Sequence, residues 1–251
     1  MNPMRRHEMI MKVILNRKNV TVNELSDKLQ VTGKTIREDL SRLEEQGLIQ
    51  RIHGGAVLAQ SDQFGILGSR QPLDKHAAEK IEIALLALTH IVQDDIIALD
   101  GGSTTLEIAR RLDNMPLTVI TNDVYIISEL VRKDQIRLVV PGGYRVRNIL
   151  AGPEAAAYVQ SLNIEKAFLS ATAIHITHGL SVYTGDSLDY KQALTQTARK
   201  VFATADHHKF GQVALRTFAS LEQVDVILTD KGLSQAAAEQ YRQAGVVIEC
   251  G

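Results

Sequence analysis

Polar and charged side chains gather on one face of a helix that is expected to begin near residue 33. In the segment TGKTIREDLSRLEEQG, Ile36, Leu40 and Leu43 fall at i, i+4 and i+7, which predicts a buried apolar stripe. The opposite face carries Lys34, Thr35, Arg37, Glu38, Ser41 and Arg42. Cationic and hydroxyl groups contact phosphates and base edges, and the first residues of such a helix enter the major groove. The pattern therefore predicts a recognition helix for double-stranded DNA.

The elements that must position this helix resemble those of a helix-turn-helix. Residues 4–17 are expected to form a first helix, and Val22, Leu25 and Leu29 give one apolar face of a second. Thr32 is placed to cap the recognition helix, because its hydroxyl can accept a free backbone N–H at the helix start.

A small β-wing is expected after the recognition helix. Gly47 is suited to end that helix, and residues 48–58 are expected to extend, turn at a Gly-Gly pair and return. Arg51 and His53 then lie near the wing tip, where they could grip a DNA backbone or minor groove. The alternative is an ordinary helical hairpin with a solvated charged face. Spacing, cap, glycine stop and wing all agree, which favours DNA binding.

A second group of chemically useful residues follows the apolar run at 96–99. The segment is Asp100-Gly101-Gly102-Ser103-Thr104-Thr105, immediately before a helical pattern. Glycines let the backbone approach a ligand closely, and free N–H groups at a helix N-terminus with hydroxyl side chains make an anion site. A tight turn with Ser103 or Thr104 as a simple N-cap is the alternative.

Other polar or glycine-containing turns follow further apolar runs. They supply Thr121, Asn122, Gly142, Gly143, Asp206 and Lys209, and a preceding helix supplies Lys191. We expect these turns to share one pocket, since ligands in such sheets bind where strands end. The two lysines would neutralise a phosphate, while Asp100 and Asp206 would accept hydrogen bonds from sugar hydroxyls. No recognised zinc spacing is shown by His175, His178, His207 and His208, so neither a metal site nor a cofactor is predicted.

The C-terminal part of the chain is expected to be an α/β sheet domain. Helical patterns separate many of its short apolar runs, and several runs lack polar alternation, which favours a mostly parallel sheet covered on both faces. The expected strands are 96–99, 117–121, 137–140, 167–170, 201–205 and 224–229, with a helix over 76–90 before them. Gly, Ser, Pro and Gln mark 59–74 as a linker. We therefore expect a DNA-binding domain at 1–58 and an α/β domain at 75–251.

Composition is that of an ordinary globular protein, with 251 residues, 45% of them hydrophobic and 23% charged. Residues 1–58 hold ten Lys/Arg and seven Asp/Glu, a net charge of +3, which leaves −4 for the rest of the chain. This modest asymmetry fits a DNA-binding head on a different body. A single cysteine, Cys250, and no run of 18 apolar residues predict a cytoplasmic protein without a membrane segment.

The segment TGKTIREDLSRLEEQGLIQRIHGGA resembles the signature of the DeoR family of bacterial transcriptional repressors. One departure is Glu38, where the family commonly has a second arginine, and a carboxylate there could accept a hydrogen bond from a cytosine amino group. Further segments occur in the same order as in the family's sensor domain, namely LDGGSTT, VITND, VPGGYR, KAFLSA and ADHHKFG. The resemblance implies a fold similar to ribose-5-phosphate isomerase and the coenzyme A transferases, and a phosphorylated sugar or hexitol as effector.

The leading hypothesis is a repressor of a sugar or hexitol catabolic operon that binds operator DNA as a homodimer or homotetramer. The linker is expected to transmit sensor geometry to the heads. Two alternatives stay open, a sugar-phosphate isomerase carrying a DNA-binding head and a ligand-free dimerising DNA-binding protein. Against the enzyme, the loop Ala171-Thr172-Ala173-Ile174 lacks the acid that the related isomerases have there. The sequence leaves open the operator, the effector, the oligomeric state and the direction of the response.

Overall fold

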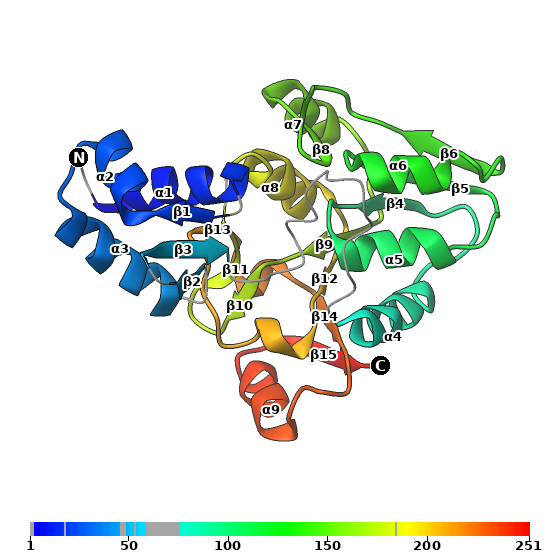
Figure 1. Ribbon diagram of the computed structural model, residues 1–251. Helices are drawn as coiled ribbons and strands as arrows, with labels where there is room; N and C mark the ends of the chain where they lie inside the picture. Colours follow the sequence, from blue (N-terminus) through cyan, green and yellow to red (C-terminus); the bar gives the residue numbers. More distant parts are fainter. Residues whose placement is uncertain (1–2, 18, 46–48, 53, 59–75, 184) are drawn as a thin grey trace.

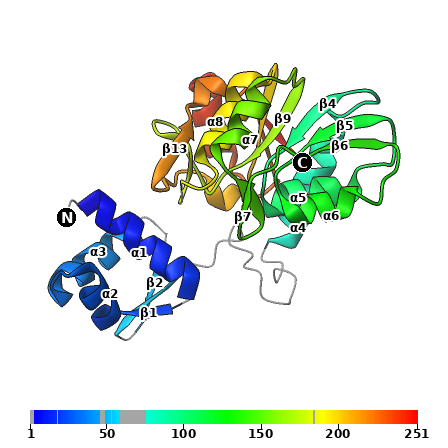
Figure 2. The same ribbon diagram turned by 90° about the horizontal axis from the view of Figure 1, so that it is seen from above.

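The computed structural model describes the chain except for residues 1–2, 18, 46–48, 53, 59–75 and 184. Gly47, His53 and the predicted linker therefore lie outside the described residues. The described chain folds into a small N-terminal head and a larger α/β body (Figures 1 and 2).

The head contains three helices and a three-stranded sheet in the order β1-β3-β2. Its elements are α1 (Pro3–Arg17), β1 (Asn19–Thr21), α2 (Val22–Leu29), α3 (Gly33–Glu45), β2 (Ile49–Ile52) and β3 (Gly55–Leu58). The helices and the wing are those that the sequence predicted, and β1 adds an unpredicted third strand. Thr21 forms a capping box with Glu24 at the start of α2.

The apolar stripes of the head form its core as predicted. Leu25, Ile36 and Leu43 are fully buried, and Leu40 is nearly so. The Thr32 hydroxyl accepts the backbone N–H of Thr35 at 3.2 Å, which confirms the predicted cap of α3.

The body is built on a seven-stranded sheet in the order β15-β14-β12-β9-β4-β5-β6, and every neighbouring pair is parallel. These strands are β4 (Ile96–Leu99), β5 (Leu117–Ile120), β6 (Ile136–Val139), β9 (Lys166–Ser170), β12 (Lys200–Thr204), β14 (Val226–Thr229) and β15 (Val247–Cys250). The predicted α/β class is confirmed, and six of the strands match predicted runs to within two residues. The edge strand β15 was not predicted.

Helices cover both faces of this sheet (Figure 2). The covering helices are α4 (Ala77–Leu88), α5 (Ser103–Arg111), α6 (Val124–Leu130), α7 (Pro153–Gln160), α8 (Leu188–Thr197) and α9 (Gln235–Gln243). One core contains side chains of α4, α5 and α6, and a second contains side chains of α7, α8 and α9. Ile97 and Leu99 of β4 belong to the first core and Ala98 to the second, as alternation along a strand requires.

The body also contains two small antiparallel sheets. One is the hairpin of β7 (Tyr144–Val146) and β8 (Ile149–Ala151), and the other joins β10 (Ala173–His175), β11 (Gly179–Val182) and β13 (Arg216–Ala219). Neither was predicted. Gly143 enters the hairpin at φ +109°, where an added Cβ would lie 2.3 Å from the Ala151 carbonyl oxygen, so a side chain is excluded there.

The head lies beside the second small sheet in Figure 1. Three body residues, Ala173, Tyr183 and Ala214, belong to the same buried cluster as the core of the head. Within the described residues, no helix is both long and apolar enough to cross a membrane.

Candidate functional site

The candidate effector site lies at the carboxyl ends of β4, β9 and β12, three neighbouring inner strands of the parallel sheet. This is the end of the strands at which open α/β sheets bind ligands. Two cavities open here, and both are lined by Ser170, the last residue of β9. Of the turns predicted to share one pocket, those after β4 and β12 line the second cavity together, whereas the predicted residues after β5 and β6 line neither cavity.

A buried ion pair lies beneath the first cavity. Lys191 of α8 donates to the Asp100 carboxylate and also to the Ser170 carbonyl oxygen at 2.8 Å. The same Asp100 oxygen accepts the Ser170 N–H at 3.0 Å and the Ser170 hydroxyl at 2.9 Å. Asp100 is 1% and Lys191 3% exposed.

This pairing gives the two residues a role different from the predicted one. Asp100 lines neither cavity, and its bonded oxygen is already occupied by protein donors. Lys191 lines the first cavity, but its charge is balanced by Asp100. The pair therefore fixes Ser170 at the point where the cavities meet, instead of offering a free carboxylate and a free ammonium group to a sugar phosphate.

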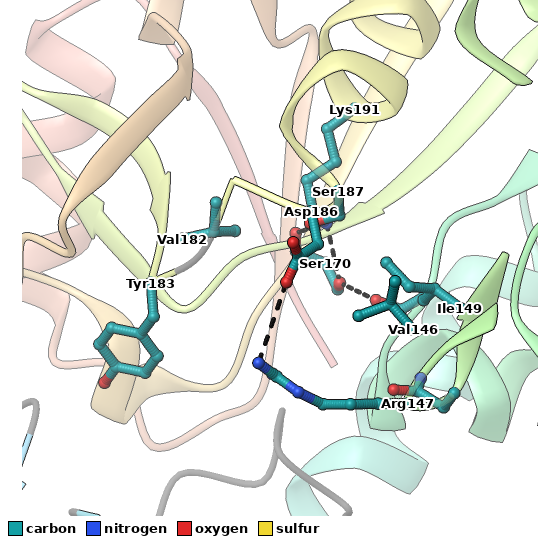
Figure 3. A pocket seen from close by; sticks show the side chains of 11 residues that line it. Val146, Arg147, Ile149, Ser170, Val182, Tyr183, Asp186, Ser187 and Lys191 are labelled. Carbon is teal, nitrogen blue, oxygen red and sulfur yellow. Dashed lines mark hydrogen bonds and ion pairs between the residues drawn. The ribbon is translucent and has the colours of Figure 1, made fainter. Parts of the chain in front are cut away.

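The first cavity lies between the β7–β8 hairpin and the start of α8 (Figure 3). Arg147 extends from the hairpin toward Asp186, with 3.9 Å between Nη2 and Oδ2. Most of the rest of its lining comes from Gly101, Ser170, Tyr183, Ser187 and hairpin residues 146–149. Burial lowers the pKa of Arg147, and the Asp186 charge opposes that shift. The cavity thus presents a cation, a carboxylate and hydroxyls at close range.

The second cavity lies at the N-terminus of α5. Ser103 and Thr104, both predicted, line it together with Asp206 and Lys209 after β12. Free backbone N–H groups and the helix dipole favour an anion at such a terminus. Lys80 of α4 and Thr204 also line this cavity. Lys80 was not predicted as a site residue, because it stands in an alanine-rich helical pattern as one charged residue among several.

Gly102 allows the loop before α5 to approach β9 closely. An added Cβ would lie 2.6 Å from both Cβ and Oγ of Ser170. Glycine at this position therefore serves a close approach to Ser170, whereas the predicted close approach was to a ligand.

Like Asp100 and Gly102, five further predicted residues support the site without lining either cavity. The Thr105 hydroxyl donates to the Asp100 carbonyl oxygen, and Thr121 accepts the Asp123 N–H at 3.2 Å. Asn122 donates to the Leu150 carbonyl oxygen at 3.0 Å. Gly142 and Gly143 shape the entry to the hairpin, both with positive φ.

Asp123 is a residue that the sequence analysis missed. It caps α6 by accepting the Tyr125 N–H at 2.8 Å and the Ile126 N–H at 3.2 Å, and its other oxygen accepts from Asn148. Burial raises the pKa of Asp123 to about 6, and the charge of Asp100 adds to this rise. The hydrogen bonds to Asp123 lower the pKa, but burial outweighs them. An Asp immediately before an apolar helical run is a recognised N-cap signal. Asp123 thus joins α6 to the hairpin that carries Arg147.

The predicted DNA-contacting face of the head is open to solvent. Lys34, Arg37, Glu38, Arg42 and Arg51 are exposed, and so is the capping residue Thr32, while Thr35 and Ser41 are half-buried. The Arg51 side chain donates to the Ser41 hydroxyl at 3.1 Å, and its backbone N–H donates to Glu44 at 2.8 Å. The wing is therefore tied to the recognition helix.

An unpredicted buried cluster fixes α3 against α1. Asp39 accepts from Arg6 and lies 2.9 Å from His7 Nε2. Burial would raise the pKa of Asp39, but the hydrogen bonds from Arg6 and His7 outweigh it and hold the pKa below 3.8. Asp39 falls three residues after Ile36 on the buried face, and this position is the sequence signal that could have found it.

Comparison with known proteins covers both parts of the chain. The DeoR-like helix-turn-helix domain matches residues 6–62, and the DeoR C terminal sensor domain matches residues 75–231. The HTH-type transcriptional regulator GolR of Listeria innocua is 32% identical over 99% of both chains. The HTH-type transcriptional regulator GlpR of Haloferax volcanii is 31% identical over 100% of this chain and 99% of that one. Among solved structures, that of ribose 5-phosphate isomerase A from Methanocaldococcus jannaschii superposes with a TM-score of 0.41. It covers 54% of this chain and 55% of that one, at 17% sequence identity.

Proposed function

Because this chain belongs to the DeoR family of helix-turn-helix transcriptional regulators, we propose that it represses a sugar or hexitol catabolic operon and releases its operator when a phosphorylated sugar binds. The observation that carries the effector assignment is the second cavity. It combines the N-terminus of α5 with the hydroxyl-bearing residues Ser103 and Thr104 and two lysines, Lys80 and Lys209.

The phosphate group is assigned to this second cavity. Helix N-termini bind phosphate through backbone N–H groups, and lysine side chains add positive charge. The sugar chain would then extend past Ser170 into the first cavity. Arg147, Asn148 and Asp186 there offer donors and acceptors for hydroxyl groups.

The head would bind double-stranded DNA with α3 in the major groove. The exposed side chains of Lys34, Arg37 and Arg42 suit this role. Two heads of a homodimer, or four of a homotetramer, would occupy half-sites about one helical turn apart, as paired helix-turn-helix domains do. Operator binding would place the protein in the cytoplasm.

Turnover of the sugar phosphate is not part of the proposal. Isomerisation needs a positioned carboxylate to move a proton between adjacent carbons. Asp100 is paired with Lys191, and Asp206 accepts the His208 N–H at 3.1 Å as the cap of the following short helix. The loop 171–174 carries no acid. Incubation with ribose 5-phosphate should yield no ketose, whereas a measurable turnover would favour the enzyme alternative.

The decisive experiment is a titration of operator DNA from upstream of the protein's own operon, repeated with a panel of phosphorylated sugars and hexitols. One compound should weaken operator binding, and Lys209→Ala should need about tenfold or more of that compound, since a charge-assisted hydrogen bond contributes ~1.5–3 kcal/mol. Lys231→Ala is the matched control, because Lys231 is exposed and pairs with Glu82 away from both cavities.

The outcome decides between effector binding and a ligand-free platform. If no compound changes the affinity for operator DNA, and none raises the melting temperature of the protein, the effector assignment is wrong. A bound ligand must stabilise the folded protein by mass action, so the melting temperature detects binding even without release.

A further inference from the structure

We propose that a divalent cation of the zinc type binds between His76, Glu79 and His208, where the start of α4 meets the loop after β12. One ligand atom from each of these residues lies within 4.8 Å of the other two. The sequence spacing predicted no metal site, because these ligands come from segments about 130 residues apart in the chain.

The distances fit a zinc site that is nearly assembled. His76 Nδ1 lies 3.3 Å from Glu79 Oε1. Two ligands bonded at about 2.0 Å to one tetrahedral zinc are themselves about 3.3 Å apart. The His76 and His208 rings have centroids 4.1 Å apart, and the ligand atom of His208 lies within 4.8 Å of the other two.

Local backbone structure holds the first two ligands together. Glu79 follows His76 by three residues at the start of α4, which places both on one helical face. His76 has φ +63°, a left-handed conformation that is uncommon outside glycine, and it makes no side-chain cap to the helix. Strained residues of this kind cluster at functional sites. The His76 imidazole is turned to Glu79 instead of to the helix N–H groups.

Further polar groups lie around His208. Its backbone N–H donates to Asp206, and the centroid of the His207 ring lies 3.8 Å from that of the His208 ring, with the two rings tilted by 38°. His207 Nδ1 in turn lies 2.6 Å from the Asp230 carboxylate. Asp206 thus fixes the backbone at His208, and Asp230 orients the neighbouring His207 ring.

The ligand set selects the class of metal. Two imidazoles and one carboxylate suit zinc and other late first-row ions, whereas calcium and magnesium prefer oxygen ligands alone. Three protein ligands leave a fourth position, and His208 is exposed, so water can occupy it. A bound ion would cross-link α4, which begins soon after the predicted linker, to the loop that supplies Lys209 to the second cavity.

The test is direct metal binding by the full chain without an affinity tag, after dialysis against a chelator. Calorimetry with zinc should give one site per chain. Cobalt(II) should give the intense visible absorption of tetrahedral coordination. His208→Ala and Glu79→Gln should each weaken zinc binding by about tenfold or more, because loss of even an outer-shell partner costs 10–100-fold.

His178→Ala is the matched control, because His178 is an exposed histidine outside this cluster and pairs with His175. It should bind zinc like the unaltered chain. His208 is exposed, so its replacement should leave the fold intact, as circular dichroism would verify. The proposal is overturned if zinc fails to bind at about 100 μM, some 5.5 kcal/mol of binding free energy, or if His208→Ala and the unaltered chain bind it equally. The assay contains neither DNA nor sugar, so its result is independent of the proposed function.

Discussion

Lys191 and Asp100 form a buried ion pair that fixes Ser170 between the two cavities. Both side chains are at most 4% exposed, and Ser170 bonds to each of them. Replacement of one partner in a buried pair leaves an uncompensated charge, whereas replacement of both with neutral groups removes that penalty. The pair is therefore a structural device, and its energetic role can be separated from effector binding.

Lys191→Met should lower the free energy of unfolding by about 3–5 kcal/mol, because it leaves the Asp100 carboxylate unpaired. The double variant Lys191→Met with Asp100→Asn should recover much of that loss, since Asn keeps an acceptor for Ser170. Denaturant unfolding of the three proteins measures both effects. Equal stability of Lys191→Met and the unaltered chain would contradict the pairing.

The role of Lys191 shows where sequence reasoning stops. The sequence placed Lys191 correctly near the loop at 100–105, because ligand sites of α/β sheets gather residues from the ends of several strands. Its partner lies 91 residues away, and only the folded sheet brings Asp100 beside it. Sequence patterns place residues on elements, but they do not specify which buried charges neutralise one another.

The β7–β8 hairpin was missed for a different reason. Its turn contains Arg147 at φ +56°, and the usual glycine or asparagine signal is absent at that position. The strands of the main sheet, in contrast, are continuous apolar runs such as Ile96–Leu99, which their length and their flanking turn residues identify. The best-predicted part of the site is therefore the loop between β4 and α5, and the least predicted is the hairpin wall with Arg147.

Asp39 offers a test of what orients the recognition helix. Asp39→Ala should cost about 3 kcal/mol of stability, because Arg6 loses a buried carboxylate partner. Operator affinity should fall with it, since the cluster joins α1 to α3. Its pKa is held low, so this stability is present above pH 3.8 and is lost as the pH falls further. Chemical unfolding and operator titration provide the measurements.

Asp27→Ala is the control for the Asp39 variant, because Asp27 lies on an exposed surface of α2. Exposed replacements usually change stability by no more than about 0.5 kcal/mol. If the two variants are equally stable, the buried cluster does not hold the helix.

Asp123 should make the stability of the sensor fall as the pH rises from about 4 to 6. Its pKa is raised from 3.8 to about 6 in the folded protein, so the folded state binds the proton more tightly than the unfolded state. The stabilisation is complete below pH 3.8 and is lost as the pH passes the folded value. Asp123→Asn should remove this contribution, and asparagine still caps a helix well.

The measurement is the free energy of unfolding of both proteins at several pH values between 4 and 7. The difference between them should change by about 2–3 kcal/mol across that range, since each pKa unit corresponds to ~1.4 kcal/mol. Other carboxylates titrate in both proteins and cancel in the difference. A difference that is constant with pH would show that Asp123 titrates normally.

Glu38 should determine base preference and should weaken affinity for DNA in general. It is exposed on α3, 4.0 Å from Lys34, where a carboxylate repels phosphate but can accept from a cytosine amino group. Glu38→Gln should strengthen binding to unrelated DNA and reduce discrimination at one base pair by about 1–3 kcal/mol. Titration against operators altered one position at a time measures this. Unchanged discrimination at every position would remove Glu38 from base recognition.

Tyr183 connects the first cavity with the core of the head. It lines the first cavity, and it also belongs to the buried cluster that contains the core of the head. A ligand changes DNA affinity only if it contacts the two states differently, and such coupling amounts to about 1–3 kcal/mol in typical cases. Tyr183→Ala should therefore reduce the ratio of operator Kd values with and without effector, while effector binding is largely kept.

The ratio should be measured alongside effector affinity by calorimetry, so that lost binding is not mistaken for lost coupling. Tyr158→Ala provides the comparison, since Tyr158 is an exposed tyrosine on α7 and lines neither cavity. Its Kd ratio should match that of the unaltered chain. If Tyr183→Ala binds effector and still releases operator by the same factor, the signal does not pass through this contact, and the linker at 59–74 becomes the route to test.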